Sequence, residues 1–415
     1  MRRIMLTVSA LALAACGGGT DVAEVPEAGT AVAEAPVAAN APAVDVAALH
    51  DRILTLDTHI DIPLTYITEI DPTGPTELQV DLPKLAEGRL DSGFWIVYTP
   101  QGELTEEGYA AALEIAETRM SALERLTGET DDFALARTSG DVRRIVAAGN
   151  HAVLVGMENG YPLGADFADL GRWAERGVRY VGLTHFGHNQ FGDSSNPHPQ
   201  RDDGPRHDGL SEQGRALVSA LNDAGIMVDV SHAGKQTMMQ AAELSRSPII
   251  ASHSGVKAVA DSARNLDDEQ LRKIAEVGGV AQMVALGAYV KLPTPEQQAA
   301  RDALDAEFGD RSTWDQAKRD RYGERREAIT AMAPEATVSD FVDHIDHAVR
   351  VAGIDHVGIA SDFDGGGGID GWKDASETEN VTAELVARGY SEADIAKIWG
   401  GNLLRVLDAA QAAAR

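Results

Sequence analysis

The chain has 415 residues, of which 65 are Asp or Glu, 36 are Lys or Arg and one is Cys. This length accommodates one large α/β domain or two smaller ones, and the hydrophobic content of 44% is enough for a packed core. A formal net charge of −29 argues against nucleic-acid binding, which relies on clusters of basic side chains that neutralise phosphates. With a single Cys, an intramolecular disulfide is excluded.

The first residues have the pattern of a bacterial secretory signal. Arg2 and Arg3 precede an apolar run, residues 4–15, that is too short for a membrane-spanning helix. The run ends in Leu13-Ala14-Ala15-Cys16, which resembles the lipobox of bacterial lipoproteins. That resemblance implies cleavage before Cys16, its lipidation, and a chain anchored to a membrane of the bacterial cell envelope, at the outer membrane or in the periplasm. The alternative is an ordinary signal peptide in which Cys16 is incidental.

The segment that follows has the composition of a tether. Residues 17–45 contain nine Ala, three Pro, four Gly and five acidic residues, but no aromatic residue, Lys or Arg. Such a segment cannot bury enough apolar surface to offset the entropy lost on ordering. We therefore predict a signal peptide at residues 1–15, a lipidated Cys and disordered tether at 16–46, and one folded domain at 47–415.

From residue 47 onward, short apolar runs alternate with stretches of helical periodicity. The runs are the expected strands, at Ile53–Leu56, Phe94–Tyr98, Ala152–Val155, Tyr180–Leu183, Met227–Val230, Ile249–Ala251, Val280–Val284 and His356–Ile359. The amphipathic stretches are the expected helices, at Thr105–Leu126, Ser211–Ala224, Lys235–Leu244, Asp267–Val277 and Val338–Ala352. This alternation predicts an α/β fold, a (β/α)8 barrel of the TIM type. An open doubly wound sheet is the alternative, weakened because no Gly-rich dinucleotide loop follows the first run.

One charged stretch interrupts the alternation. Residues 291–335 have helical propensity and separate the seventh expected strand from the eighth. We interpret them as an insertion over one face of the barrel, either a lid or an outer cap.

Polar residues gather where the expected strands end. Six of the eight runs finish with His, Asp or Glu, and the residues concerned are Asp57, His59, Asp61, Glu158, His185, Asp229, His232, His253, Asp362 and Asp364. In a barrel these ends converge on the carboxyl face, where active sites lie. Taken singly, each has a structural explanation, such as a core or capping histidine or a turn aspartate. Together, three of these four histidines and two or more of the carboxylates would suit zinc, and a bridging carboxylate would hold two metal ions about 3.5–4 Å apart.

The order and spacing of these motifs resemble the membrane (renal) dipeptidase family of zinc metallopeptidases. The resemblance runs from about Leu49 to about Arg405. It rests on the runs Asp57-x-His59-x-Asp61, Gly156-Met157-Glu158-Asn159, Leu183-Thr184-His185 with Asn189, Ser231-His232, Ser252-His253-Ser254, Ala263-Arg264-Asn265 and Ser361-Asp362-Phe363-Asp364-Gly365. It implies a barrel dipeptidase with two Zn²⁺ per chain, dipeptides as substrates, and a homodimer as in many members.

The resemblance also implies a ligand set for the two zinc ions. His59 and Asp61 would hold one ion, His232 and His253 would hold the other, and Glu158 would bridge the pair. The reaction expected at such a pair is attack of a metal-bridging hydroxide on the peptide carbonyl.

Three further residues take catalytic or substrate-binding roles by the same resemblance. His185 would face the scissile carbonyl and stabilise its developing charge, and Asp362 would take and return the proton. Arg264 would bind the free α-carboxylate of the substrate, so that only very short peptides are cleaved. Asp57 is a candidate acceptor for the second ring nitrogen of a ligand histidine.

Some residues have no clear place in the family pattern. Tyr289 lies near the position of a substrate-contacting tyrosine of some relatives, without an unambiguous match. The loop of residues 187–209 holds further histidines that could shape substrate choice, although a solvated loop is the simpler interpretation; they are His188, His198 and His207. The remaining histidines belong to no motif and are expected not to be ligands: His50, His151, His344, His347 and His356.

Two other functions compete with a dipeptidase. One is another two-metal barrel amidohydrolase, a group in which H-x-H is usual where this chain has His59-x-Asp61. The other is a non-catalytic lipoprotein that binds peptides, which would need neither two metals nor a proton-handling Asp362.

Overall fold

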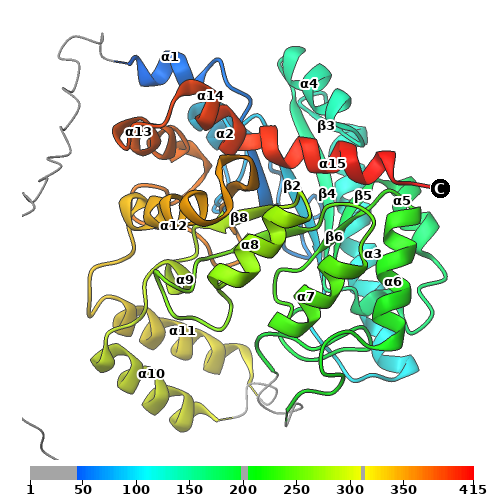
Figure 1. Ribbon diagram of the computed structural model, residues 1–415. Coiled ribbons are helices and arrows are strands. Elements are labelled where there is room, and N and C mark those ends of the chain that lie inside the picture. Colours follow the sequence, from blue (N-terminus) through cyan, green and yellow to red (C-terminus); the bar gives the residue numbers. More distant parts are fainter. Residues whose placement is uncertain (1–43, 198–203, 310–313) are drawn as a thin grey trace, which may run out of the picture. The chain divides into compact units, whose positions relative to one another are not determined.

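Eight parallel strands form a nearly closed barrel in the computed structural model, which describes residues 44–197, 204–309 and 314–415 (Figure 1). In order around the barrel they are β1 (Leu56–Ile60), β2 (Ser92–Tyr98), β4 (His151–Glu158), β5 (Val178–Gly182), β6 (Met227–Asp229), β7 (Ile250–Ser254), β8 (Val280–Val284) and β9 (Val357–Ala360). A short strand, β3 (Phe133–Leu135), pairs with β4 outside this ring. The ring closes where Ile60 bridges to Phe363. The predicted TIM-like barrel is confirmed.

Helices surround the strands. The α-helices are α1 (Val46–His50), α2 (Leu82–Gly88), α3 (Glu106–Glu129), α4 (Ser139–Ala147), α5 (Leu170–Arg176), α6 (Glu212–Asp223), α7 (Lys235–Leu244), α8 (Asp268–Glu276), α9 (Gly287–Val290), α10 (Pro295–Phe308), α11 (Gln316–Thr330), α12 (Val338–Ala352), α13 (Glu379–Ala387), α14 (Glu392–Ala396) and α15 (Asn402–Ala412). Short 3-10 turns cover Tyr161–Leu163, Ile354–His356 and Ala375–Glu377, and a π-helical turn covers Lys397–Gly401.

The five expected helices correspond to α3, α6, α7, α8 and α12, with ends displaced by at most three residues. Their starts are fixed by side chains that accept hydrogen bonds from amides of the first turn, as Thr105, Ser211 and Asp267 do.

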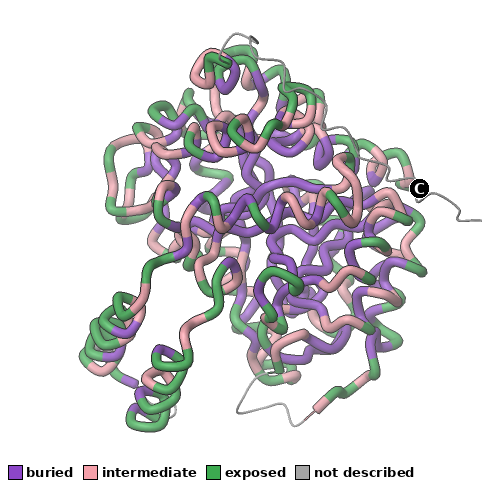
Figure 2. The backbone as a smooth tube through the Cα atoms, turned by 60° about the vertical axis from the view of Figure 1, so that its left-hand side comes forward, coloured by how far each residue is buried: buried purple, intermediate pink, exposed green. Residues whose placement is uncertain are grey.

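Alternate strand residues face inward and outward, which divides the core in two. On β2, Phe94 and Ile96 belong to the cluster inside the barrel, whereas Trp95 and Val97 pack toward the surrounding helices. The inner cluster also contains the first residues of several strands and the apolar face of α15, so this helix closes the amino-terminal end of the barrel. Figure 2 shows the buried residues concentrated in the strands and the exposed ones on the outer helices. The carboxyl end of the barrel is thereby left for polar side chains.

The first strand differs from the expected one. It begins at Leu56 and includes Asp57 and His59, whereas the sequence pattern placed it at residues 53–56. The prediction from the apolar run was wrong because this completely buried strand contains polar residues, which form the site and not the apolar core. The short strand β3 was not expected at all.

The helices α10 and α11 lie within the segment interpreted as an insertion. They share a small apolar cluster of their own, formed by Leu304, Phe308, Trp314, Tyr322 and Ile329. The chain reaches them directly from α9, which lies next to the barrel's carboxyl end (Figure 1). A role as lid or cap stays a prediction.

The amino-terminal predictions fall on residues that the structure does not describe. Residues 1–15, Cys16 and most of the 16–46 tether lie outside the described residues. Within the residues that are described, none of the helices is long and apolar enough to cross a bilayer.

Candidate metal centre

The predicted site residues meet at the carboxyl end of the barrel. His59 lies in β1, Glu158 ends β4 and His253 lies in β7, so three separate strands bring them together. Asp61, His185, His232 and Asp362 lie in the loops that follow β1, β5, β6 and β9. Among the described residues, groups able to hold a metal ion are His59/Glu158/His253, Glu158/His185/His232 and His59/Asp61/Asp362.

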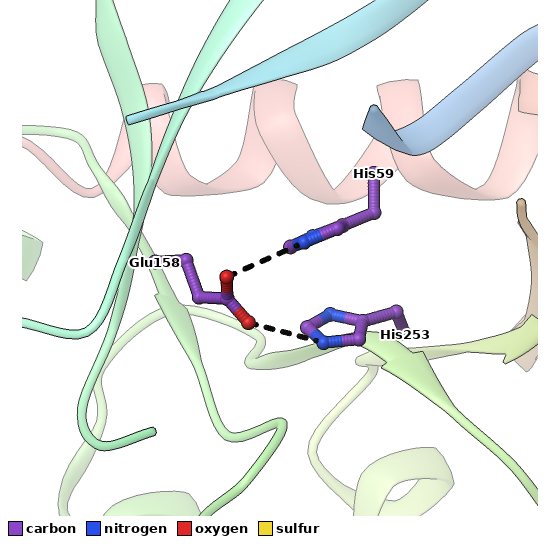
Figure 3. A group of neighbouring side chains, drawn as sticks. All are labelled: His59, Glu158 and His253. Atoms are coloured by element: carbon purple, nitrogen blue, oxygen red, sulfur yellow. Dashed lines mark ion pairs between the residues drawn. The ribbon is translucent and has the colours of Figure 1, made fainter. Parts of the chain in front are cut away.

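Glu158 is at the centre because its two carboxylate oxygens face different partners. Oε1 lies 2.9 Å from Nε2 of His232 and 3.3 Å from Nε2 of His253. Oε2 lies 3.6 Å from Nε2 of His59. Figure 3 shows His59 and His253 approaching these two oxygens. Each oxygen could therefore serve a different ion.

His59 has the surroundings of a metal ligand. Its Nε2 is buried and has no hydrogen-bond partner among the described residues. Carboxylate oxygens of Asp61 and Asp362 lie 3.5 and 3.7 Å from it. Ligand atoms about 2.1 Å from a tetrahedral zinc ion are about 3.4 Å apart, so this spacing fits a shared ion better than direct hydrogen bonds.

Hydrogen bonds to the far side of two rings fix which nitrogen is free. The Tyr180 hydroxyl donates to the carbonyl of Thr58 at 3.2 Å, so its oxygen accepts from Nδ1–H of His59 at 3.0 Å. The remaining ring nitrogen of His59, Nε2, is then left with a lone pair that can bind a metal ion. His253 has the same arrangement.

At His253, the intermediate hydroxyl belongs to Ser252. The Ser252 Oγ donates to Oδ2 of Asp229 at 2.7 Å and therefore accepts from Nδ1–H of His253 at 2.9 Å. The Nε2 atoms of His253 and His232 point at each other across 2.9 Å, as two ligands of one ion would.

The electrostatics of the cluster favour metal ligands in their binding forms. Burial, with nearby positive charge, holds the pKa values of His232 and His253 well below the ordinary value, so both rings are neutral. Burial opposes ionisation of Glu158, but the histidines around it, His185 and His59 foremost, hold its pKa well below the ordinary value.

A positive charge is favoured beside His59. Burial lowers its pKa, but the charges of Glu158 and Asp61 outweigh burial and hold that pKa well above the ordinary value. A metal ion would supply the same positive charge and displace the proton. The donor set and its electrostatics therefore fit a metal such as zinc.

A cavity of about 480 Å³ opens over the cluster. It is lined by Asp61, Glu158, His185, His232, His253 and Asp362 together with Ile62, Pro63, Leu78, Tyr98, Arg119, Phe186, Leu286, Tyr289, Asp364 and Gly365. The His185 ring is held between neighbours, with ring centres of Tyr98 and Phe186 at 4.9 and 4.7 Å. Burial lowers the pKa of His185. Burial also raises the pKa of Asp362, to about 8, against the opposing charge of His59.

Arg264 lies beside this cavity, in a smaller one. It is 2% exposed and lines a pocket of about 90 Å³ that shares His232 with the larger cavity. Its guanidinium donates to the carbonyl of His253 at 2.9 Å and to Oγ of Ser254 at 3.2 Å. Within the described part of the chain, Nε of Arg264 is buried without a hydrogen-bond partner. The ring of Tyr289 is 5.4 Å away.

Several site residues were missed or misassigned from the sequence. Tyr289, which had no unambiguous place, lines the cavity. Tyr180, and not Asp57, binds the second nitrogen of His59; Asp57 instead accepts the backbone amides of His59 and Ser361. A buried tyrosine inside an apolar strand gives no sequence signal for this role.

The other described histidines lie outside the three groups able to hold a metal ion. In the described part of the chain they bind elsewhere, as in the contacts of His50 with Thr382, His151 with Leu90, His188 with Ser194, His207 with Asn189, His344 with Val256, His347 with Asp268 and His356 with Gly279. His198 lies outside the described residues.

Comparison with known proteins identifies the family. The family described as membrane dipeptidase (peptidase family M19) matches residues 44–415. The chain belongs to this family. The M19 match covers the whole barrel, so the chain is a metallo-dipeptidase with buried His and Glu clusters.

Individual relatives agree with this M19 assignment. The chain is 31% identical to dipeptidase tcpJ of Claviceps purpurea, over 81% of this chain and 70% of the relative. It is 32% identical to dipeptidase aclJ of Aspergillus oryzae, over 81% and 71%. The crystal structure described as the probable dipeptidase PvdM from Pseudomonas aeruginosa has a TM-score of 0.81 and 39% identity, covering 89% of this chain and 98% of that one.

Proposed function

We propose that this M19 dipeptidase uses two zinc ions to hydrolyse dipeptides. The observation that carries the proposal is the position of Glu158, whose two oxygens face His59 on one side and His232 with His253 on the other. A single ion would leave one of these groups without a cation.

In this proposal Glu158 bridges the two ions, His59 and Asp61 complete one site, and His232 and His253 complete the other. When bound, such ions lower the pKa of a water molecule and polarise the peptide carbonyl. The residues around them then handle the proton, the oxyanion and the ends of the substrate.

Asp362 is the proposed proton carrier. It is buried, and burial raises the pKa of its carboxyl group to about 8 in the metal-free protein, so it holds a proton more readily than an exposed aspartate. It lines the cavity, so it can take the proton of the attacking water and pass it to the leaving amine.

His185 is the proposed donor to the oxyanion. Its lowered pKa keeps the ring neutral, with one N–H available for the carbonyl oxygen as negative charge develops. Contact with Tyr98 and Phe186 restricts the ring, so little reorganisation is needed during the reaction.

Arg264 is the proposed receptor for the substrate carboxylate. A buried guanidinium whose Nε has no hydrogen-bond partner among the described residues is costly unless an anion accompanies it. The α-carboxylate of a dipeptide, reaching from the cavity toward the pocket that shares His232, would supply that anion.

The test is zinc content together with hydrolysis of a dipeptide panel, using tripeptides and amidated dipeptides as controls. We expect two zinc ions per chain, cleavage of dipeptides, and little cleavage of either control. Equal cleavage of the amidated dipeptides would remove the role of Arg264, and fewer than two zinc ions would contradict the bridging role of Glu158.

We also propose that the mature protein is a lipoprotein of the bacterial cell envelope, and a homodimer. The lipoprotein is supported by the amino-terminal sequence, in which Cys16 follows a signal-like segment and begins the 16–46 tether to the 47–415 domain. The homodimer is proposed from the resemblance to the family alone. Mass spectrometry of the membrane fraction should find diacylglyceryl-modified Cys16, absent in Cys16→Ser. Light scattering of the domain should give twice the mass of one chain.

A further inference from the structure

Two buried aspartates that are not part of the metal cluster make the same pair of contacts. Oδ1 of Asp57 accepts the amide of His59 at 3.1 Å and the amide of Ser361 at 2.9 Å. Oδ1 of Asp229 accepts the amide of Ser231 at 3.0 Å and the amide of Ser252 at 2.9 Å. In each case one oxygen joins the residue two positions ahead to a residue in the neighbouring strand, Ser252 in β7, or directly after it, Ser361 after β9.

These amides lie at or directly before four members of the metal cluster. Asp57 holds the amide of His59 and the amide that precedes Asp362. Asp229 holds the amides that precede His232 and His253. Each carboxylate therefore fixes the backbone of two cluster residues, one in a strand and one in the loop after the neighbouring strand.

The joined strands are those with the least backbone pairing. β6 and β7 share a single paired position, Asp229 with Ile250. β9 meets β1 only beyond its own end, through the bridge between Ile60 and Phe363 and the hydrogen bond from the Asp362 amide to the His59 carbonyl. By contrast, β2 and β4 pair at seven consecutive positions. We call the sparsely paired boundaries β1/β9 and β6/β7 seams. At each seam, Oδ1 of an aspartate accepts an amide in place of a backbone carbonyl oxygen.

The same contacts support strained backbone. His232 and Asp362 have φ values of 64° and 60°, in the left-handed region that residues with a Cβ atom seldom adopt. Each follows a serine whose amide is held by one of the two aspartates. Such strain persists only where the surrounding structure enforces it.

We propose that Asp57 and Asp229 are positioning residues that set the metal-binding geometry by holding the β1/β9 and β6/β7 seams. The inference rests on the proposed function, because it concerns the geometry of the proposed zinc ligands. It requires an oxygen acceptor at each position and not the negative charge itself.

The test compares Asn and Leu at each position. Asn keeps a side-chain carbonyl that can accept both amides, whereas Leu has a similar shape and no acceptor. Asp91 is the matched control. Its carboxylate accepts the Thr55 amide at 3.0 Å and so joins the segments that precede β1 and β2, at the amino-terminal end of the barrel. Each variant is measured for Zn²⁺ affinity by chelator competition and for the visible absorption spectrum of bound Co²⁺.

We expect Asp57→Leu and Asp229→Leu to bind Zn²⁺ about 10- to 100-fold more weakly, with an altered Co²⁺ spectrum. Asp57→Asn should stay within tenfold of the wild type, as should Asp91→Leu and Asp91→Asn. Asp229→Asn should bind Zn²⁺ more tightly than Asp229→Leu, because it keeps the acceptor of the two amides and loses only the acceptor of the Ser252 hydroxyl. Wild-type affinity in both Leu variants would overturn the proposal, and so would a loss beyond tenfold in Asp57→Asn or an affinity of Asp229→Asn no higher than that of Asp229→Leu.

A measurement on the unaltered protein covers the case in which a Leu variant does not fold. The amides of Ser231 and Ser361 should exchange with deuterium as slowly as those of β2, although neither lies in a strand. Exchange at the rate of an exposed loop would overturn the proposal. If the wild type bound no metal, that result would contradict the proposed function. The exchange rates would still test the hydrogen bonds that Asp57 and Asp229 accept.

Discussion

At the scale of single residues, the site depends on side chains whose charge is held in place by burial and by one another. Glu158 stays ionised inside the barrel only because histidines surround it. His59 in turn is surrounded by carboxylates. Removing one member therefore leaves the others without the charge that balances them.

Glu158→Gln tests the bridge. The amide keeps the size of the side chain but loses the charge, so zinc content should fall below two per chain and kcat/KM by at least about 10³-fold, or about 4 kcal/mol. Glu117→Gln is the control, because Glu117 forms surface ion pairs with Arg172 and Arg176. Full zinc content and activity in Glu158→Gln would contradict the bridge.

His185→Ala separates a substrate contact from a metal ligand. If His185 stabilises the oxyanion, kcat should fall about 10²- to 10³-fold while zinc content is unchanged. A loss of zinc would show instead that His185 is a ligand, in the group that it forms with Glu158 and His232. His151→Ala, at the start of β4, is the control and should leave kcat unaltered.

The positions of these residues could be predicted from the sequence because each follows or ends an apolar run. The contacts that orient them could not be. Tyr180 lies within a buried strand and looks like a core residue, and only the barrel brings its hydroxyl to His59. The pocket of Arg264, apart from the main cavity, likewise depends on loop packing that no local pattern encodes.

At the scale of helices and strands, the number of backbone-paired positions differs between neighbouring strands of the barrel. Buried aspartates join neighbouring segments by accepting their backbone amides. Besides Asp57 and Asp229, Asp91 joins the segment before β1 to that before β2 through Thr55. Burial raises the pKa of Asp91 from 3.8 to about 6, so its ionised form is disfavoured in the folded state.

This raised pKa predicts a pH dependence of stability. Because the folded pKa lies above the unfolded value of 3.8, the contribution of Asp91 to the free energy of unfolding should fall between about pH 4 and pH 6 and then level off. Asp91→Asn should remove that fall. The free energy of unfolding of the variant minus that of the wild type should therefore be about 2 kcal/mol larger at pH 7 than at pH 4. Urea unfolding at several pH values measures it, and parallel curves for both proteins would contradict it.

Most of the elements with strong periodicity were predictable, and the exceptions have physical causes. The amphipathic helices α7 and α12 agree with the expected bounds at both ends. β1 was placed too early because its buried residues include Asp57 and His59, which break the apolar pattern. β3 has only three residues, too few for a period to be seen.

At the scale of the whole molecule, the metal cluster joins segments from both ends of the barrel sequence. His59 comes from the first strand and Asp362 from the loop after the last, so the cluster lies where the ring closes. Bound ions would therefore stabilise the closed barrel and not only the active site.

Metal removal should accordingly lower the thermal midpoint. At a free zinc concentration of 100 times Kd, each ion adds about 2.7 kcal/mol, so chelation should lower Tm by roughly 5 to 10 °C. Added Zn²⁺ should restore the midpoint, whereas Mg²⁺ should not, because it prefers oxygen ligands over imidazole. An unchanged Tm after verified removal of the metal would contradict this stabilising role.

The most direct measurement of the central claim is an anomalous difference map at the zinc edge from crystals grown with Zn²⁺. We expect two peaks about 3.5–4 Å apart, one beside His59 and Asp61 and one beside His232 and His253, with Glu158 touching both. A single peak, or two peaks that do not share Glu158, would contradict it.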